Sequence, residues 1–214
     1  MTRGIRFDLE YETMPWHKVD TVVFDIGNVL IYYAPDDFLE RLFPGNKALQ
    51  EKMMKEVYQG KYWPMFDRGT IEYEEAGRLL SQECGESYEN YMKAITGWID
   101  MKRPIEEGFA CAKRCRRAGK RLWLLSNYAR VGYERLREKF SDLFADFEGA
   151  TVSCYWHLLK PEHEIYEVLI REAKLDPQRT LFIDDSLPNI EAANEMGIHG
   201  FHASSQEKMT RFFL

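Results

Sequence analysis

The chain has 214 residues, a length that fits one α/β domain or one such domain carrying an insertion. Hydrophobic residues make up 45% and charged residues 30% of it, which is ordinary globular usage and excludes a disordered or collagen-like protein. With 29 basic and 35 acidic residues the net charge is −6, and no long basic run occurs. We therefore expect neither nucleic acid nor an anionic membrane surface as a main partner.

The four cysteines, Cys84, Cys111, Cys115 and Cys154, form no CxxC pair and no cluster with histidine at zinc-ligand spacing. We expect them to be reduced, mostly buried residues of a cytoplasmic protein. Residues 1–18, the expected N-terminal arm, contain no apolar stretch typical of a signal peptide, and no run of about 18 apolar residues follows. The sequence thus predicts a soluble, non-exported protein and gives no indication of its oligomeric state.

Short and almost continuous apolar runs occur at 21–25, 121–126 and 180–184. Continuous rather than alternating apolarity is typical of strands that are buried on both faces of a parallel sheet. Two further short strands are expected near 151–154 and 198–202. Helical patterns follow these runs at 104–118, 161–174 and 187–196, and proline or glycine marks their ends.

This alternation of strands and helices predicts an α/β fold with a Rossmann-like, doubly wound parallel sheet. Its core would comprise residues 19–34 and 101–214. Between these parts, residues 35–100 contain no buried strand and are expected to form a helical cap over the carboxyl edge of the sheet, where ligands bind in such folds. The helices expected there span roughly 35–43, 46–58, 70–82 and 87–98, with a loop at 60–69.

Each of the three buried runs ends in a polar residue capable of chemistry. Asp25 follows the first run, Ser126-Asn127 the second and Asp184-Asp185 the third, while Lys160 precedes a helix between the last two. A single Asp, Ser or Lys in such a place is more often a turn former, a helix cap or a solvated side chain. The ordered set indicates one catalytic site, because the carboxyl ends of parallel strands meet at the same edge.

In this order the segments FDIGNVL (24–30), Ser126, Lys160 and FIDDSLPN (182–189) resemble the four motifs of the haloacid dehalogenase superfamily. FDIGNVL is similar to the form found in bacterial phosphatases of sugar phosphates, and to the amino-terminal phosphatase domain of soluble epoxide hydrolases. The resemblance implies a hydrolase, a phosphatase acting on a small phosphorylated metabolite. It covers the expected core and places residues 35–100 at the position of that family's cap.

Carboxylate chemistry supports the same interpretation. A carboxylate can attack phosphorus and form an aspartyl phosphate, and Asp25 is the candidate nucleophile. Several carboxylates at one edge repel each other unless a dication such as Mg²⁺ neutralises them. The resemblance implies that Asp25, Asp185 and the carbonyl group of Gly27 are inner ligands of Mg²⁺, with Asp184 farther from the ion.

Other residues are candidates for binding substrate. Ser126 and Lys160 can stabilise the charge of the transferred phosphoryl group, and Asn127 is expected beside them. Asn189 either orients Lys160 or the acidic loop, or it is an ordinary helix residue. Trp63 and Arg68, in the 60–69 loop, are expected to contact the leaving group, although Trp63 and Phe66 could instead only join the cap to the core.

Gly27 departs from the family pattern, which has a second Asp two residues after the nucleophile to protonate the leaving group. Losing such a group typically costs about 10²–10⁴-fold in rate, so we expect a steep dependence on the leaving group. Gly27 also leaves open a phosphate-binding protein without catalysis. A metal-free haloacid dehalogenase is a further alternative, but it would not need the pair Asp184-Asp185.

Overall fold

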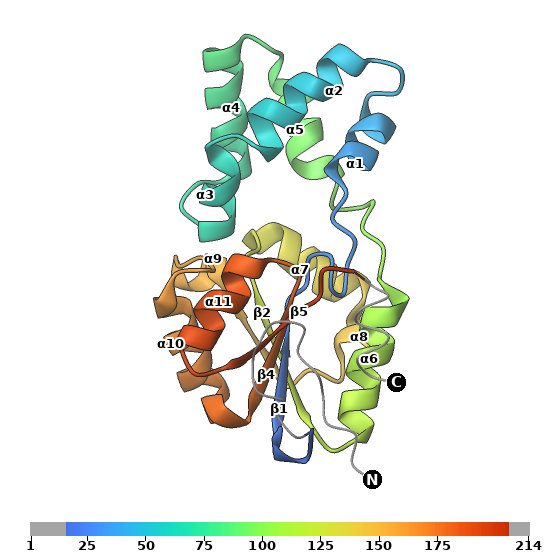
Figure 1. Cartoon of the computed structure of the whole chain (residues 1–214). Helices are drawn as coiled ribbons and strands as arrows, with labels where there is room; N and C mark the ends of the chain where they lie inside the picture. The colour runs from blue at the N-terminus through green and yellow to red at the C-terminus, as the bar shows by residue number, and fades with distance from the viewer. Residues whose placement is uncertain (1–15, 206–214) are drawn as a thin grey trace.

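The computed structural model describes residues 16–205 and contains one parallel five-stranded sheet with helices on both faces (Figure 1). The strands are β1 (Thr21–Phe24), β2 (Arg121–Ser126), β3 (Gly149–Val152), β4 (Thr180–Asp184) and β5 (His199–His202). Their order across the sheet is β3-β2-β1-β4-β5. This architecture confirms the predicted Rossmann-like α/β fold; of the predicted N-terminal arm, residues 1–15 lie outside the described residues.

Strand β1 lies at the centre, with β2 and β3 on one side and β4 and β5 on the other. The chain runs outward from β1 through β2 to β3 and then returns to place β4 on the other side of β1. The strand order therefore reverses between the neighbours β1 and β4. In open α/β sheets such a switch point leaves a crevice at the carboxyl ends of the strands, where ligands bind. Asp25 follows β1 and Asp185 follows β4, so the topology brings both carboxylates to this crevice.

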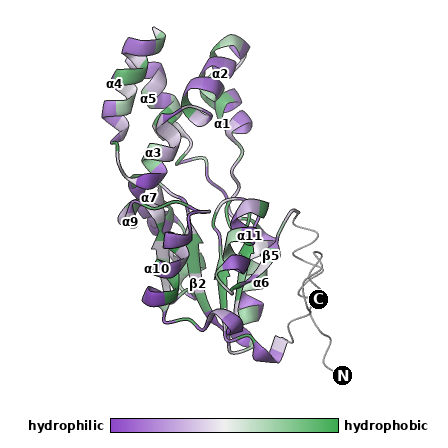
Figure 2. Cartoon of the chain, turned by 60° about the vertical axis from the view of Figure 1, so that its left-hand side comes forward, coloured by the Kyte–Doolittle hydropathy of each residue, from purple (hydrophilic) through white to green (hydrophobic). Residues whose placement is uncertain are grey.

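Two apolar clusters lie on the two faces of the sheet. On one face Phe24 packs in the cluster that also holds Phe109 of α6 (Glu106–Arg117) and Phe144 of α8 (Ser141–Phe144). On the other face Val23 and Phe182 pack against α10 (His163–Ala173) and α11 (Leu187–Glu195). Figure 2 shows the strands as the most hydrophobic part of the core, as the continuous apolar runs predict.

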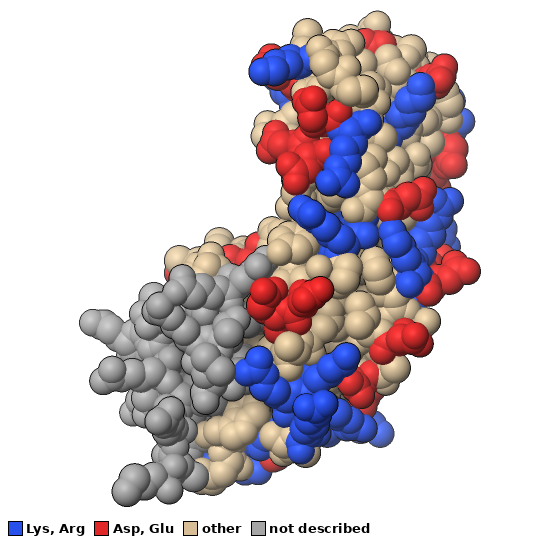
Figure 3. All heavy atoms as spheres, turned by 90° about the vertical axis from the view of Figure 1, so that its right-hand side faces the viewer, with Lys and Arg blue, Asp and Glu red and all other residues tan. Residues whose placement is uncertain are grey.

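Charged side chains of both signs are mixed over the face shown in Figure 3. Lys and Arg side chains gather in its lower part. The last turn of α6 carries Arg114, Arg116 and Arg117. Positive charge at a helix C-terminus interacts favourably with the helix dipole. Glu148 binds both Arg116 (3.3 Å) and Arg121 (2.9 Å), so part of this positive charge is offset by an acidic residue.

Helices fill the segment between β1 and α6, and Figure 1 shows them standing over the carboxyl ends of the strands. They are α1 (Pro35–Leu42), α2 (Lys47–Met53), a π-helical turn η2 (Met54–Tyr58), α3 (Tyr62–Arg68), α4 (Tyr73–Cys84) and α5 (Tyr88–Gly97). We call residues 35–98 the helical subdomain. Four of its helices lie where the sequence predicts them, although the second continues as the π-helical turn.

The predicted loop at 60–69 is wrong, because α3 occupies most of it. Pro64 is the third residue of α3, and a proline in the first turn removes no intrahelical hydrogen bond. Gly69 ends the helix with a φ of 70°, a left-handed conformation that favours glycine. The strand predicted near 151–154 is also displaced, since β3 ends at Val152 and a short helix α9 (Ser153–Trp156) follows.

The helical subdomain contacts the core through α3, and we call this set of contacts the clasp. The Arg68 guanidinium binds the Glu162 carboxylate and donates a 2.9 Å hydrogen bond to the His157 carbonyl oxygen. The Ser153 hydroxyl donates to the carbonyl oxygen of Asp67. A Cβ at Gly69 would lie 2.5 Å from the Cys154 carbonyl oxygen, so α3 ends in close contact with α9.

All four cysteines lie in the described part and are free; Cys111, Cys115 and Cys154 are buried, as expected for most of them. Among the described residues, no helix combines the length and apolarity needed to span a membrane.

Candidate active site

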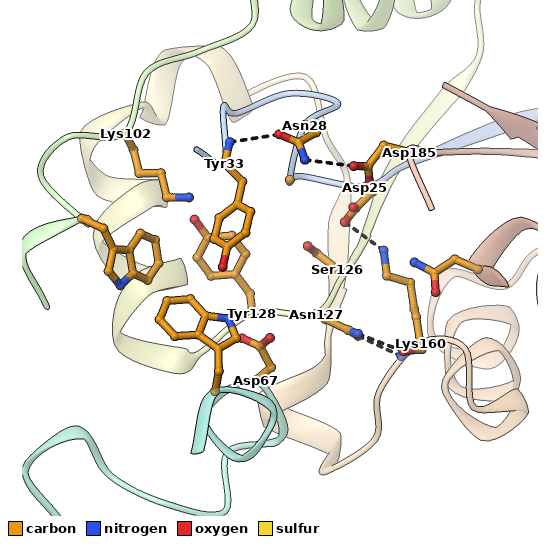
Figure 4. Close-up of a pocket in the computed structure, with 14 residues that line it drawn as sticks. Asp25, Asn28, Tyr33, Asp67, Lys102, Ser126, Asn127, Tyr128, Lys160 and Asp185 are labelled. Atoms are coloured by element: carbon orange, nitrogen blue, oxygen red, sulfur yellow. Dashed lines mark hydrogen bonds and ion pairs between the residues drawn. The ribbon is translucent and has the colours of Figure 1, made fainter. Parts of the chain in front are cut away.

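The polar residues at the ends of the strands converge on one pocket at the carboxyl edge of the sheet (Figure 4). Asp25 comes directly after β1, and its backbone N–H donates a 2.9 Å hydrogen bond to the Ile183 carbonyl oxygen of β4. Ser126 is the last residue of β2, and its side chain is almost fully buried. Parallel pairing of β1 with β2 and β4 therefore fixes the positions of these groups.

Lys160 links the carboxylates of two strands. Its Nζ lies 2.9 Å from Asp25 Oδ1 and 2.6 Å from Asp184 Oδ2, and it donates a 3.1 Å hydrogen bond to the Leu125 carbonyl oxygen. Only 2% of the side chain is exposed, which excludes the solvated lysine that the sequence left open. Burial lowers the pKa of Lys160, but the adjacent carboxylates outweigh it and hold the pKa above its ordinary value.

Two asparagines hold this arrangement in place. The Asn127 side chain donates a 3.0 Å hydrogen bond to the Lys160 carbonyl oxygen and accepts a 2.8 Å bond from the Lys160 N–H. The Asn189 side chain donates to both carboxylate oxygens of Asp184 at 3.1 Å. Both asparagines line the pocket. Asn127 thus orients Lys160 and Asn189 orients the acidic loop, while Ala129, not Ser126 or Asn127, is the N-cap of α7 (Arg130–Lys139).

Asp25, Asp184 and Asp185 form an acidic cluster in which one oxygen of each lies within 4.8 Å of the others. Burial raises the pKa of Asp25 to about 7 against the opposing charge of Lys160, and burial also raises the pKa of Asp185. One lysine cannot neutralise three carboxylates, so the donor set suits a dication. The oxygens of Asp184 already accept bonds from Lys160, Asn189 and the Ser186 N–H, which leaves Asp25 and Asp185 as the more available ligands.

The loop after Asp25 completes the wall of the pocket on the side of the sheet, which we call the lower wall because the sheet lies below the helical subdomain in Figure 1. Gly27 lines it, and the Gly27 carbonyl oxygen accepts a 2.7 Å bond from the Val29 N–H, which leaves a second lone pair free. Asn28, which the sequence analysis did not single out, adopts a φ of 51°, a left-handed conformation that Asn tolerates. Its side chain donates a 2.9 Å bond to Asp185 and accepts from the Tyr33 N–H. Asn28 therefore orients Asp185.

Aromatic side chains form the upper wall, and the pocket between the two walls has a volume of about 340 Å³. Trp63 of α3 lines it. The centre of the Trp63 ring lies 4.7 Å from that of Tyr58 and 5.6 Å from that of Trp98. Tyr33 and Tyr128 also line this wall, whereas Phe66 is buried in the apolar cluster. Trp63 is thus placed to touch a ligand, and Phe66 only joins the subdomain to the core.

Lys102 and Asp67 were missed by the sequence analysis, yet both line the pocket. Lys102 Nζ lies over four rings, at 4.4 Å from the centre of Trp98, 5.0 Å from Tyr33, 5.4 Å from Phe38 and 5.7 Å from Tyr128. Burial lowers the pKa of Lys102 to about 7, although Asp67 opposes this. Burial likewise raises the pKa of Asp67 to about 7.

Arg68 does not line the pocket, in contrast to the expectation that it contacts the leaving group. It is the residue after Asp67 on α3, and its side chain points to Glu162 and His157 on the core. Successive residues of a helix face different directions, so one of this pair faces the pocket and the other the clasp. Of the residues predicted to bind substrate, Arg68 is the one that the structure places elsewhere.

Comparison with known proteins identifies the family. The haloacid dehalogenase-like hydrolases match residues 19–197. The chain belongs to this family of hydrolases. Two curated relatives are similar over most of their length: a sesquiterpene phosphatase of Aspergillus oryzae, 23% identical over 84% of this chain and 87% of its own, and a D-ribitol-5-phosphate phosphatase of Bacteroides thetaiotaomicron, 22% identical over 86% and 91%.

Solved structures agree with this assignment at the level of the fold. A family enzyme of Bacteroides thetaiotaomicron, crystallised as an alanine variant with magnesium and inorganic phosphate, is 22% identical and has a TM-score of 0.67 over 86% of this chain and 93% of its own. A predicted hydrolase of the family from Porphyromonas gingivalis is 26% identical and has a TM-score of 0.65 over 86% of this chain and 90% of its own. These likenesses confirm the α/β core.

Proposed function

We propose that this protein is a magnesium-dependent phosphomonoesterase that acts through an aspartyl phosphate on a small phosphorylated metabolite. The observation that carries the proposal is the position of the Asp25 carboxylate, which faces the pocket beside the buried ammonium group of Lys160 and the carboxylate of Asp185. Both curated relatives are phosphatases. The core at 19–34 and 101–214 would carry out the chemistry, and the cap at 35–100 would select the substrate.

In the first half of the reaction an oxygen of Asp25 attacks phosphorus, and the bond from phosphorus to the ester oxygen breaks. Lys160 and the Ser126 hydroxyl stabilise the charge on the phosphoryl oxygens, since both groups line the pocket and are held in place by the fold. In the second half water attacks the same phosphorus and restores the Asp25 carboxylate. Hydrogen bonds with Asn127 and Asn189 hold Lys160 and Asp184 in place throughout.

Asp25, Asp185 and the Gly27 carbonyl oxygen would hold the Mg²⁺ ion, which neutralises carboxylate charge and orients a phosphate oxygen when bound. Support comes from the uncompensated charge of the acidic cluster, and from the magnesium and phosphate held by a related family enzyme. Asp184 would orient Lys160 rather than bind the ion, because its oxygens are already engaged.

The upper wall supports a leaving group that is hydroxylated rather than purely apolar, such as a sugar or polyol. Rings of Trp63 and Trp98 offer flat apolar faces. Polar groups interrupt them: Lys102 is buried among rings, and the Tyr128 hydroxyl is buried without a hydrogen-bond partner in the structure. A hydroxyl of the substrate could satisfy such groups, whereas a hydrocarbon would leave them unpaired.

The experiment is a panel of phosphate esters assayed for phosphate release with Mg²⁺ and with a chelator. We expect release from sugar and polyol phosphates, more than about 100-fold faster with Mg²⁺. Release that persists in the chelator would contradict the proposed metal requirement. Phosphate binding without release from any ester would favour the alternative that Gly27 raises, a phosphate-binding protein without catalysis.

A further inference from the structure

Gly27 leaves the proposed reaction without a proton donor on the Asp25 loop, and the opposite wall of the pocket carries one. Asp67 rises from α3 toward the space that Asp25 faces from the other side (Figure 4). Among the described residues that line the pocket, Asp67 is the one carboxylic acid outside the acidic cluster. Its backbone is fixed, because its carbonyl oxygen accepts the hydroxyl of Ser153 and the next residue, Arg68, is held by Glu162.

The direction of phosphoryl transfer explains why the position of Asp67 matters. Attacking and leaving oxygens lie roughly in line on opposite sides of phosphorus. Asp25 attacks from the end of β1, so the leaving oxygen departs away from the sheet, toward the wall formed by α3 and the aromatic residues. A proton donor on α3 therefore faces the oxygen that needs the proton.

We propose that Asp67 is the general acid and general base of the reaction, supplying from the helical subdomain the proton transfer that Gly27 cannot. This inference rests on the proposed phosphatase function. It replaces the expectation, drawn from Gly27 alone, that the rate depends steeply on the leaving group.

The proton and the electron pairs balance over the two halves. As the Asp25 oxygen bonds to phosphorus, the bond from phosphorus to the ester oxygen breaks, and that oxygen takes the proton of the Asp67 carboxyl group to leave as an alcohol. The Asp67 carboxylate then accepts a proton from water as the water oxygen attacks phosphorus. The bond from phosphorus to Asp25 breaks, and phosphate, the Asp25 carboxylate and the Asp67 carboxyl group are restored.

The surroundings of Asp67 suit an acid that gains and loses a proton near neutral pH. Burial raises its pKa to about 7, while the charge of Lys102 and a hydrogen bond from the Ala129 N–H oppose the rise. A catalytic acid works best with a pKa near the working pH. The other titratable groups that act on Asp67 or respond to it are Asp25, Lys160, Tyr33, Tyr73, Tyr128 and Cys154.

The test compares Asp67→Asn with the unchanged protein on two esters, 4-nitrophenyl phosphate and an alkyl phosphate from the active panel. Because kcat/KM covers only the steps up to departure of the leaving group, it isolates the acid role. For Asp67→Asn we expect a fall of about 10²–10⁴-fold with the alkyl ester and a much smaller fall with the nitrophenyl ester, whose leaving oxygen needs no proton. Inorganic phosphate should still bind the variant, showing that it is folded.

A second variant separates chemistry from structure. A Cβ built at Gly27 has Asp25 Oδ2, at 3.9 Å, as its nearest contact, so a side chain can begin there without a clash. The double variant Gly27→Asp/Asp67→Asn should therefore regain part of the alkyl ester activity. Equal losses on both esters for Asp67→Asn would overturn the proposal. So would recovery of the alkyl rate in Lys102→Met/Asp67→Asn, because Asp67 would then only balance the charge of Lys102. A protein that hydrolyses neither ester would instead reject the phosphatase function itself.

Discussion

Asp25 shares Lys160 with Asp184, and this sharing determines what a substitution at Asp25 does. In Asp25→Asn the ammonium group keeps its 2.6 Å contact with Asp184, so the pocket should keep its shape. The amide is no nucleophile, and we expect kcat to fall by at least about 100-fold. Inorganic phosphate should still bind, because Lys160 and the Ser126 hydroxyl remain in the pocket. Rates of phosphate release and phosphate titration by calorimetry provide the measurement; more than about a tenth of the original rate would reject Asp25 as the nucleophile.

Lys102 is buried among rings, and this should appear in the dependence of stability on pH. Because burial lowers its pKa in the folded protein to about 7, the unfolded chain holds the proton more tightly between about pH 7 and 10.5. Burying Lys102 therefore lowers the free energy of unfolding most below pH 7, and this cost shrinks as the pH rises toward 10.5. We expect Lys102→Met to raise the free energy of unfolding by up to about 4 kcal/mol near pH 7, and by about 1 kcal/mol at pH 9.5.

Urea unfolding of both proteins at the two pH values measures this difference. Lys93→Met serves as a control, because Lys93 is exposed and pairs with Glu89 on the surface of α5. An advantage of Lys102→Met that grows with pH would contradict the assignment of Lys102 as a buried, destabilised cation.

At the scale of elements, the end of α3 offers a matched comparison. Gly69 and Gly85 both end helices in the left-handed conformation, with φ of 70° and 77°. A Cβ at Gly69 would lie 2.5 Å from the Cys154 carbonyl oxygen, whereas a Cβ at Gly85 meets nothing within 4 Å. Gly85→Ala should cost only the conformational penalty, about 1 kcal/mol. Gly69→Ala should cost more and displace α3 from α9.

Activity distinguishes the two variants further. Displacing α3 moves Trp63 and Asp67 away from the pocket, so Gly69→Ala should lower kcat/KM by about tenfold or more while Gly85→Ala leaves it unchanged. Thermal unfolding and the panel assay give both quantities. Equal behaviour of the two variants would show that the contact between α3 and α9 does not position the site.

The elements also show why sequence predicts some parts of this molecule and not others. The strand predicted at 180–184 coincides with β4, because burial on both faces requires a continuous apolar run. Helix α3 was missed because Pro64 between two glycines is typical of a loop, and only the position of the proline in the first turn permits the helix.

The lower wall of the site was predictable, whereas of the upper wall only Trp63 was predicted. Asp25, Ser126 and Asp185 lie at the carboxyl ends of parallel strands that are neighbours in the sheet, so their proximity follows from the order of the elements. Asp67 and Lys102 depend on how the helical subdomain packs over the sheet, and a single acid or base in the sequence carries no spacing that would reveal it. The expectation for Arg68 failed for the same reason, since helix rotation decides which of Asp67 and Arg68 faces the pocket.

At the scale of the whole molecule, Glu162 joins the helical subdomain to the turn before Lys160. One of its oxygens accepts hydrogen bonds of 3.1 Å both from Arg68 and from the Leu159 N–H, and Leu159 precedes Lys160. The clasp is thus connected through one carboxylate to the turn that carries Lys160, the lysine proposed to bind phosphate. If closing the clasp changes the free energy of phosphate binding, then bound phosphate must change the free energy of closing the clasp by the same amount.

Because of this reciprocity, the contact between Arg68 and Glu162, which lies outside the pocket, can affect the affinity for phosphate. If closing the clasp favours the arrangement that binds phosphate, then Arg68→Gln, although remote from phosphate, should weaken its binding by about fivefold or more. Lys61→Gln removes the same charge but breaks contacts within the helical subdomain alone, the 3.0 Å bond to Glu83 and the contact with the Tyr62 ring, and should leave phosphate affinity unchanged. Equal phosphate affinities in the two variants would show that the two regions are not coupled. Weaker phosphate binding in Arg68→Gln alone would mean that the departure of product depends on the contact between α3 and the core.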